Sequence, residues 1–253
     1  MPSESVVFVH GVLGSSHDWA GLRSVAVETV GSAFAPTMPG FGEEPVPHGL
    51  EITIDGYAGW LGEQIDEQGI DRAHLVMHDF GGGFGLGWGA AHPERVASVT
   101  LIDTGILTAF RWHALARLWR TPIAGEIFNA FTTRWALGLL LRRGQPVRLP
   151  RATVDRLYAN FTPSARRVIT RLYRASDEPL LSRFADDYRR LDPPTLVIWG
   201  AHDPYLPVEQ AERQRDAFPS ADVVVLPDSG HWPHLDHPST VASLLATFLE
   251  KGI

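Results

Sequence analysis

The chain has 253 residues, 44% of them hydrophobic, so it can bury a full core as one large domain or as one domain with an insertion. A formal net charge of -7 gives no electrostatic reason to expect a nucleic acid or an acidic membrane as a partner. The absence of cysteine excludes disulfides, thiolate metal sites and cysteine nucleophiles. The first residues lack the basic start of a signal peptide, and no apolar run approaches the ~20 residues that span a bilayer, so a cytoplasmic protein is expected.

The first hundred residues alternate between strand patterns and helix patterns. Short apolar, β-branched runs predict strands, and longer amphipathic runs predict helices. The expected strands are 5–9, 33–37, 74–78 and 96–102, and the expected helices are 18–30, 52–68 and 84–92. This alternation predicts a parallel sheet that is covered by helices on both faces.

The alternation stops between residues 106 and 191, where the sequence is rich in arginine and aromatic residues and helical in pattern. It resumes with strands at 195–199 and 223–226 and helices at 207–218 and 239–250. We therefore expect a core domain formed by residues 1–105 and 192–253, with residues 106–191 inserted as a helical cap. The cap would lie above the carboxyl ends of the strands, where ligands bind in open α/β sheets.

The strand at 74–78 runs directly into His78-Asp79-Phe80-Gly81-Gly82. An apolar strand that breaks into small residues before a helix predicts a sharp turn, which lifts one side chain clear of the sheet. In serine hydrolases of this geometry the lifted residue is the Ser of Gly-x-Ser-x-Gly. Here it is Asp79, so the sequence predicts a carboxylate nucleophile and disfavours a serine esterase or a C–C bond hydrolase.

Two further polar residues follow later strands at the same edge of the sheet. Asp203 follows the strand at 195–199, and His231 follows the strand at 223–226. Nucleophile, acid and histidine in this order match the triad of α/β-hydrolases. Asp103, which ends the strand at 96–102, is an alternative triad acid, but the Gly-x-x-Asp-Pro setting of Asp203 is the commoner one.

The turn after the first strand, His10-Gly11-Val12, supplies a further element of the expected site. The backbone N–H groups of Val12 and Phe80 would together form a two-donor oxyanion site. His10 and Trp232 are expected in the wall of the substrate pocket. The apolar character of Phe80 and Trp232 predicts an apolar substrate.

These motifs resemble the α/β-hydrolase superfamily over nearly the whole length of the chain. The matching segments are His10-Gly11 with Trp19, Pro39-Gly40-Phe41-Gly42, His78-Asp79-Phe80-Gly81-Gly82, Gly200-x-x-Asp203 and Gly230-His231. Within the superfamily, the chain is most similar to the branch with an aspartate nucleophile, which contains epoxide hydrolases and haloalkane dehalogenases. Its members usually begin with a two-strand hairpin for which this chain has no room, so a sheet of about six strands is expected.

The residues around Asp79 favour an epoxide hydrolase over a haloalkane dehalogenase. Dehalogenases that resemble this chain hold the halide with side-chain N–H groups at the positions of Phe80 and Val12, neither of which can donate. Epoxide hydrolases that resemble it protonate the epoxide oxygen with cap tyrosines. The candidates for this role are Tyr158 first and Tyr173 second.

The resemblance implies a two-step mechanism without a cofactor. Asp79 attacks an electrophilic carbon to form an alkyl ester, and His231, oriented by Asp203, activates the water that hydrolyses the ester. The expected partners are a small apolar substrate and water, with no nucleic acid and no membrane. The protein would be a monomer or a homodimer.

Two rival interpretations come from other motifs. Residues 85–90 fit a dinucleotide-binding pattern, which keeps an NAD(P)-binding Rossmann oxidoreductase as the rival of a different class, but these glycines begin inside the expected helix. The histidine-rich segment 231–237 resembles a metal-ligand motif, but its spacing differs from that of metallo-hydrolases. No metal site is therefore expected.

Overall fold

The computed structural model describes residues 3–142, 145–177 and 182–251. Its centre is a six-stranded parallel sheet with the strand order β2-β1-β3-β4-β5-β6. The strands are β1 (Glu4–Val9), β2 (Ala33–Phe34), β3 (Arg72–His78), β4 (Val96–Ile102), β5 (Thr195–Gly200) and β6 (Asp222–Leu226). The predicted α/β fold with about six strands is confirmed.

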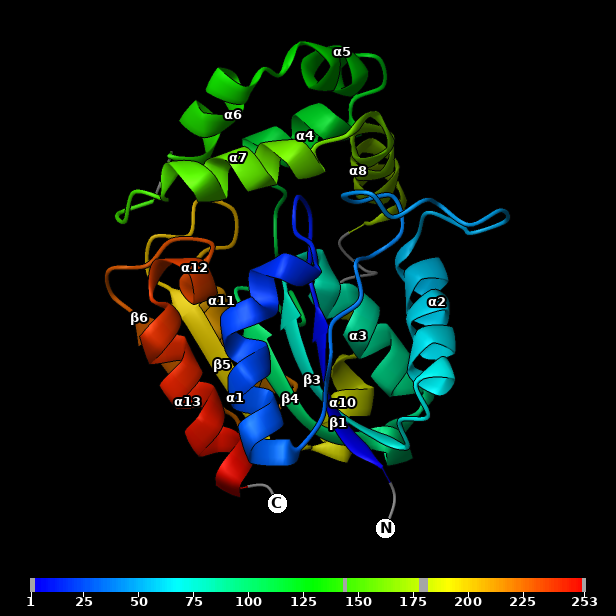
Figure 1. The fold of residues 1–253 in the computed structure, drawn as a ribbon, viewed down its shortest axis with the longest axis vertical. Helices are drawn as coiled ribbons and strands as arrows, with labels where there is room; N and C mark the ends of the chain where they lie inside the picture. The colour runs from blue at the N-terminus through cyan, green and yellow to red at the C-terminus, as the bar shows by residue number, and fades with distance from the viewer. Residues whose placement is uncertain (1–2, 143–144, 178–181, 252–253) are drawn as a thin grey trace.

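Helices cover both faces of the sheet (Figure 1). The helices α1 (Ala20–Val30) and α13 (Pro238–Lys251) pack together on one face, and α2 (Ile54–Glu67) and α3 (Phe80–Ala91) pack together on the other. The shorter core segments are η1 (Ser16–Trp19), η2 (Pro93–Arg95), α11 (Glu209–Arg213), η3 (Gln214–Asp216) and α12 (Pro233–Asp236). Among the described residues, no helix is both long enough and apolar enough to cross a membrane.

Strand β1 shows how the sequence divides the core into two layers. Successive side chains of a strand point to opposite faces of the sheet. Val6 and Phe8 therefore pack beneath α1 and α13, whereas Val7 and Val9 belong to the larger cluster beneath α2 and α3. All four side chains are fully buried, as expected for a central parallel strand that is covered on both sides.

Helix α3 begins at Phe80, four residues before the helix expected at 84–92. The glycines that suggested a turn instead form the first turn of the helix, because this turn passes very close to β1. A Cβ added to Gly81 would lie 2.1 Å from the carbonyl oxygen of Val9. Glycine is therefore required at this position by packing, although its low helix propensity favours a loop.

The segment between β4 and β5 forms the helices α4 (Ala114–Arg120), α5 (Ala124–Phe131), α6 (Arg134–Leu141), α7 (Arg151–Asn160), α8 (Pro163–Ala175) and α10 (Ala185–Leu191). Figure 1 shows α4 to α8 above the carboxyl ends of the strands. Helix α10 instead packs against the core, where the Tyr188 hydroxyl donates to the Leu86 carbonyl oxygen at 3.0 Å. We therefore propose that the cap ends before α10 rather than at residue 191.

Candidate active site

Asp79 lies at the sharp turn between β3 and α3. Its backbone has φ 50° and ψ -128°, a conformation that non-glycine residues rarely adopt. Neighbouring glycines make room for it, since a Cβ on Gly11 would lie 2.5 Å from the Asp79 Cβ. The Thr104 hydroxyl donates to the Asp79 carbonyl oxygen at 2.5 Å and fixes the turn from the side of β4. The turn therefore holds a strained residue whose side chain faces the cap.

The Asp79 carboxylate is half-buried and accepts hydrogen bonds from backbone donors. Val12 N–H donates to Asp79 Oδ2 at 2.8 Å, and the Phe80 N–H is a second backbone donor to the carboxylate. Burial raises the pKa of Asp79, while the positive charge of His231 and the two N–H groups oppose that rise. The two backbone N–H groups that the sequence suggested as oxyanion donors therefore both contact the Asp79 carboxylate.

His231 and Asp203 form a close buried pair. His231 Nδ1 donates to Asp203 Oδ2 at 2.7 Å, and Asp203 Oδ1 accepts from the backbone N–H groups of Tyr205 and Leu206. Burial alone would lower the pKa of His231, but the charge and hydrogen bond of Asp203 and the charge of Asp79 outweigh it, so the pKa is raised. This bond leaves His231 Nε2 as the ring nitrogen available to exchange a proton in the pocket.

Asp103 lies behind this pair rather than within it. Its carboxylate accepts from the Gly200 N–H at 3.1 and 3.2 Å and is completely buried. Burial and the nearby negative charge of Asp203 raise its pKa well above the ordinary value. Of the two acids left open by the sequence, the structure therefore brings Asp203 and not Asp103 to His231.

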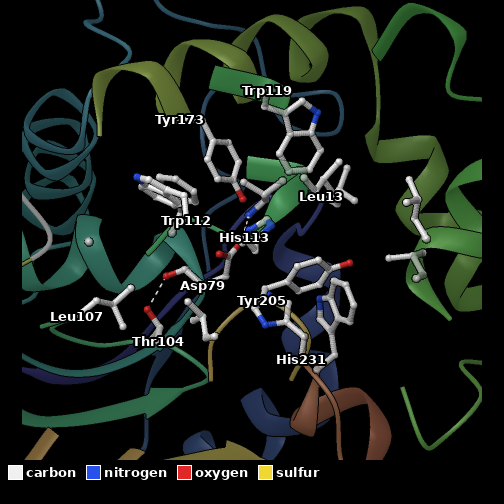
Figure 2. A pocket seen from close by; sticks show the side chains of 18 of the residues that line it. Leu13, Asp79, Thr104, Leu107, Trp112, His113, Trp119, Tyr173, Tyr205 and His231 are labelled. Atoms are coloured by element: carbon white, nitrogen blue, oxygen red, sulfur yellow. Dashed lines mark hydrogen bonds between the residues drawn. The ribbon is translucent and has the colours of Figure 1, made fainter. Parts of the chain in front are cut away.

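Asp79 and His231 open into one pocket between the sheet edge and the cap (Figure 2). The cap contributes mostly apolar and aromatic side chains to its wall, including Trp112, Trp119, Phe128, Leu137, Leu141 and Tyr173. Trp232, which was expected in the wall, is also part of it. Among the described residues, no arginine or lysine lines this pocket, so it is suited to an uncharged apolar ligand.

Of the two cap tyrosines that were candidates, only Tyr173 of α8 lines the pocket. Its hydroxyl points toward Asp79 in Figure 2. Burial and the Asp79 charge raise the pKa of Tyr173 well above its ordinary value, so its proton is retained at neutral pH. Tyr158 of α7 is half-buried and packs against the hydrophobic core outside the pocket wall.

Sequence reasoning missed Tyr205 and His113, which also line the pocket. The Tyr205 ring packs edge-on against the His231 ring at 4.9 Å. Its position two residues after Asp203 was the available signal, because residues close to a strand-end acid share its loop. His113 caps α4 through Nδ1, and burial lowers its pKa to about 4, so its ring is neutral.

His10 does not line the pocket, although it was expected there. Its ring is buried, with Nε2 accepting from the Met38 N–H and Nδ1 donating to the Gly11 carbonyl oxygen, both at 2.8 Å. Burial lowers the pKa of His10 and keeps the ring neutral, as this pattern of one donor and one acceptor requires. His10 thus links two loops beneath the site instead of contacting a ligand.

Comparison with known proteins agrees with this architecture. The family described as alpha/beta hydrolase fold matches residues 4–238, so the chain belongs to that family. A 2-hydroxymuconate semialdehyde hydrolase from a Pseudomonas species is 25% identical, over 98% of this chain and 87% of the relative.

Two solved structures share the fold at lower identity. The structure of the protein DBJA has a TM-score of 0.82 at 21% identity, covering 99% of this chain and 90% of its own. A meta-cleavage product hydrolase from Pseudomonas fluorescens has a TM-score of 0.80 at 20% identity, covering 100% of this chain and 92% of its own. These likenesses establish the fold, and the family membership makes the chain an α/β-fold hydrolase.

Proposed function

We propose that this hydrolase opens the epoxide ring of an apolar substrate through a covalent alkyl ester on Asp79. The observation that carries the proposal is the carboxylate at the turn between β3 and α3. It is held by two backbone N–H groups and faces an apolar pocket that also contains the His231–Asp203 pair. A carboxylate at this position can attack carbon directly, because it needs no base to remove a proton.

In the first step, ionised Asp79 attacks one epoxide carbon. A new C–O bond forms to the carboxylate while the ring C–O bond breaks, and the departing ring oxygen takes the proton of the Tyr173 hydroxyl. The phenol is suited to this role because burial and the Asp79 charge keep it protonated until the alkoxide develops. The product of the step is a hydroxyalkyl ester of Asp79.

In the second step, His231 Nε2 takes a proton from a water molecule that attacks the ester carbonyl of Asp79. The N–H groups of Val12 and Phe80 stabilise the oxyanion of the tetrahedral intermediate, which collapses to a diol and the free carboxylate. The proton held by His231 then restores the Tyr173 phenol, so that both groups return to their starting state. Ester formation also removes the negative charge of Asp79, which contributes to the raised pKa of His231 in the free enzyme. The pKa of His231 is therefore lower in the ester intermediate than in the free enzyme, so its neutral, basic form is more populated when the water must be activated.

A C–C bond hydrolase is the function suggested by the names of several relatives, which act on a semialdehyde or on dienoates. Dienoates are carboxylate anions. The pocket offers no arginine or lysine among the described residues, and Asp79 would repel a second negative charge. This function is therefore less well supported here than reaction with an uncharged electrophile.

Haloalkane dehalogenation is the second candidate, because the apolar wall around Asp79 also suits an uncharged haloalkane. Asp79 would form an alkyl ester in this reaction too, but the halide leaves the molecule, whereas the epoxide oxygen stays attached to its ester as a hydroxyl group.

Intact-protein mass of the His231→Ala variant distinguishes these functions. Without the base, the ester should accumulate. A mass gain equal to the whole epoxide is expected, and it should disappear when Asp79→Asn is added. A gain equal to a haloalkane less hydrogen halide would favour the second candidate. His113→Ala is the matched control, because it removes a pocket histidine that lacks an acidic partner, and it should accumulate no ester. An unmodified His231→Ala protein under conditions where the wild type forms diol would refute the covalent mechanism.

A further inference from the structure

An apolar stripe crosses the outer surface of the cap helices α5 and α6, at the end of the molecule farthest from the sheet (Figure 1). Large apolar side chains recur there at every fourth position, and all are exposed: Ile123, Ile127, Phe131, Trp135 and Leu139. We call these five residues the cap stripe. Phe131 and Trp135 are 78% and 75% exposed, whereas the other exposed large hydrophobic residues of the described chain are the separate valines Val27, Val46 and Val225.

The stripe is not needed for packing within the chain. The inner faces of the same two helices already have a role, because Phe128, Thr132, Leu137 and Leu141 line the substrate pocket. Helices α5 and α6 are therefore apolar on both sides, with one side closing the pocket and the other facing solvent. A contiguous apolar surface of this kind on a soluble domain marks an interaction site.

The charges of the molecule are distributed very unevenly around this stripe. Residues 106–184, which precede α10, contain 14 of the 22 lysines and arginines but 4 of the 29 acidic residues, so a basic cap lies on an acidic core. A surface groove beside the stripe is lined by Trp135 and Leu139 together with four arginines: Arg134, Arg142, Arg148 and Arg151. Arg142 and Arg148 form no ion pair with any described residue. Unneutralised positive charge therefore borders the apolar surface.

We propose that the cap stripe docks on the surface of an anionic phospholipid bilayer. Aromatic and aliphatic side chains that enter the acyl boundary, flanked by arginines that meet anionic headgroups, are the features of a helix that lies in the membrane interface. A second copy of this chain fits the surface less well, because pairing through the stripe would place two basic caps against each other. The net charge of -7 conceals this local complementarity, which is why the sequence alone predicted no membrane partner.

Docking would place the pocket wall formed by α5 and α6 directly at the bilayer.

The proposal concerns binding and does not rest on the proposed catalytic function, so the two can fail separately. It is tested without substrate, by flotation of the full chain with vesicles of phosphatidylglycerol and phosphatidylcholine or of phosphatidylcholine alone.

The wild type is expected to float with the anionic vesicles. The Phe131→Ser/Trp135→Ser variant should lower the partition coefficient at least about tenfold, because it removes the two largest groups that would enter the bilayer. Val27→Ser is the matched control, because it removes an exposed apolar side chain from α1, on the surface of the core domain. This variant should bind the vesicles as the wild type does. Arg142→Glu/Arg148→Glu should weaken binding by about fivefold or more per arginine, and added salt should weaken wild-type binding.

Circular dichroism melting of each variant shows that it is folded, which is expected because all substituted side chains lie on the surface. Failure of the wild type to bind anionic vesicles, or equal binding to neutral ones, would overturn the proposal. So would sedimentation showing a dimer that the Phe131→Ser/Trp135→Ser variant dissolves, because the stripe would then be a contact between copies. Loss of flotation in millimolar inorganic phosphate at constant ionic strength would also overturn it, in favour of a site for the free anion.

Discussion

Asp79 combines two opposing electrostatic effects at a single residue. Burial raises the pKa of Asp79, and the His231 charge with two backbone donors opposes that rise. A poorly solvated anion is a stronger nucleophile than one in water, because no hydration shell must be removed before attack. The strained backbone of Asp79, at φ 50°, directs its side chain into the pocket.

Replacing Tyr173 with Phe should impair ring opening and leave substrate binding nearly unchanged. The variant keeps the ring that packs against Phe80 but loses the proton donor. We expect kcat/KM for epoxides to fall by about 10²- to 10³-fold, within the range typical of a lost general acid. Tyr158→Phe is the matched control, and its steady-state kinetics should stay within about twofold of the wild type. Equal losses in the two variants would contradict the assignment of Tyr173.

Asp203 and Asp103 should respond differently to the same substitution. Asp203→Asn removes the charge that orients His231 and raises its pKa, so hydrolysis of the ester should slow by at least about 10²-fold. Asp103→Asn keeps an oxygen that can accept from the Gly200 N–H, and its effect should stay below about tenfold. Rapid-quench measurement of ester decay separates these rates from ester formation. A larger loss in Asp103→Asn would make Asp103 the functional acid.

The pH dependence of turnover follows from the two shifted groups. His231 acts as a base in its neutral form, and its pKa lies above 6.5, so ester hydrolysis should slow as the pH falls through that raised value. In the proposed mechanism Asp79 attacks in its ionised form, and burial raises its pKa, so ester formation should slow as the pH falls through that raised value. Single-turnover profiles of the wild type should show both limbs. The His231→Ala variant should keep only the Asp79 limb in ester formation.

At the scale of elements, the contact between β1 and α3 determines where the turn at Asp79 lies. Glycines in the first turn of α3 allow its backbone to approach the end of β1, and the Thr104 side chain fills the space beside Gly82. The helix N-terminus and the Val12 N–H thereby reach the same carboxylate. The oxyanion donors depend on this close approach of two elements, not on any side chain.

Gly81→Ala should therefore destabilise the protein, although alanine is the better helix former. The new Cβ would lie 2.1 Å from the Val9 carbonyl oxygen, and backbone on both sides must shift, at a cost of about 1–3 kcal/mol. Gly59→Ala is the control, because Gly59 lies on the exposed face of α2, where an added Cβ would meet no described atom within 4 Å beyond its own turn of helix. It should stabilise the protein by about 0.5–1 kcal/mol. Urea unfolding measures both. Stabilisation by both substitutions would show that the contact between α3 and β1 does not require glycine at position 81.

At the scale of the whole molecule, polar contacts tie the cap to the core around the pocket. Arg156 of α7 pairs with Asp18 at 2.9 Å, and the Asn160 side chain donates to the Leu13 carbonyl oxygen at 3.1 Å. Asp18 is nearly buried, so its carboxylate depends on this arginine and on the Ser15 N–H for compensation. These contacts hold the pocket roof over Asp79.

Removing Arg156 should lower the free energy of unfolding more than removing an arginine on the cap surface does. Arg156→Ala leaves the buried Asp18 without its cation, which we expect to cost about 1–3 kcal/mol. Arg134→Ala breaks a pair with Asp155 in which both side chains are over 40% exposed and screened by solvent, so it should leave the stability nearly unchanged. Thermal melting and limited proteolysis of the cap compare the two variants. Equal stability would show that the cap is held by apolar contacts alone.

The sequence by itself determined the layers of this protein and indicated which polar residues lie at the carboxyl edge of its sheet. Apolar periodicity predicted the strands of the sheet, because burial on both faces leaves few polar positions in a parallel strand. The positions of Asp79, Asp203 and His231 after β3, β5 and β6 predicted that they meet, because parallel strands end at one edge. Both predictions rest on local sequence patterns, together with the rule that parallel strands end at the same edge of the sheet.

Only the tertiary structure decided which cap residues face the pocket. Tyr173 reaches it and Tyr158 does not, and Tyr205 enters from the core loop beside His231, because the orientation of short helices depends on packing between distant segments. The same reason explains why α10 joins the core and why α3 begins within a run of glycines. Helix propensity is a local preference of less than about 1 kcal/mol per residue, and the close contact with β1 outweighs it. The selection between Asp103 and Asp203 also required coordinates, since both end neighbouring strands and only their side-chain directions separate them.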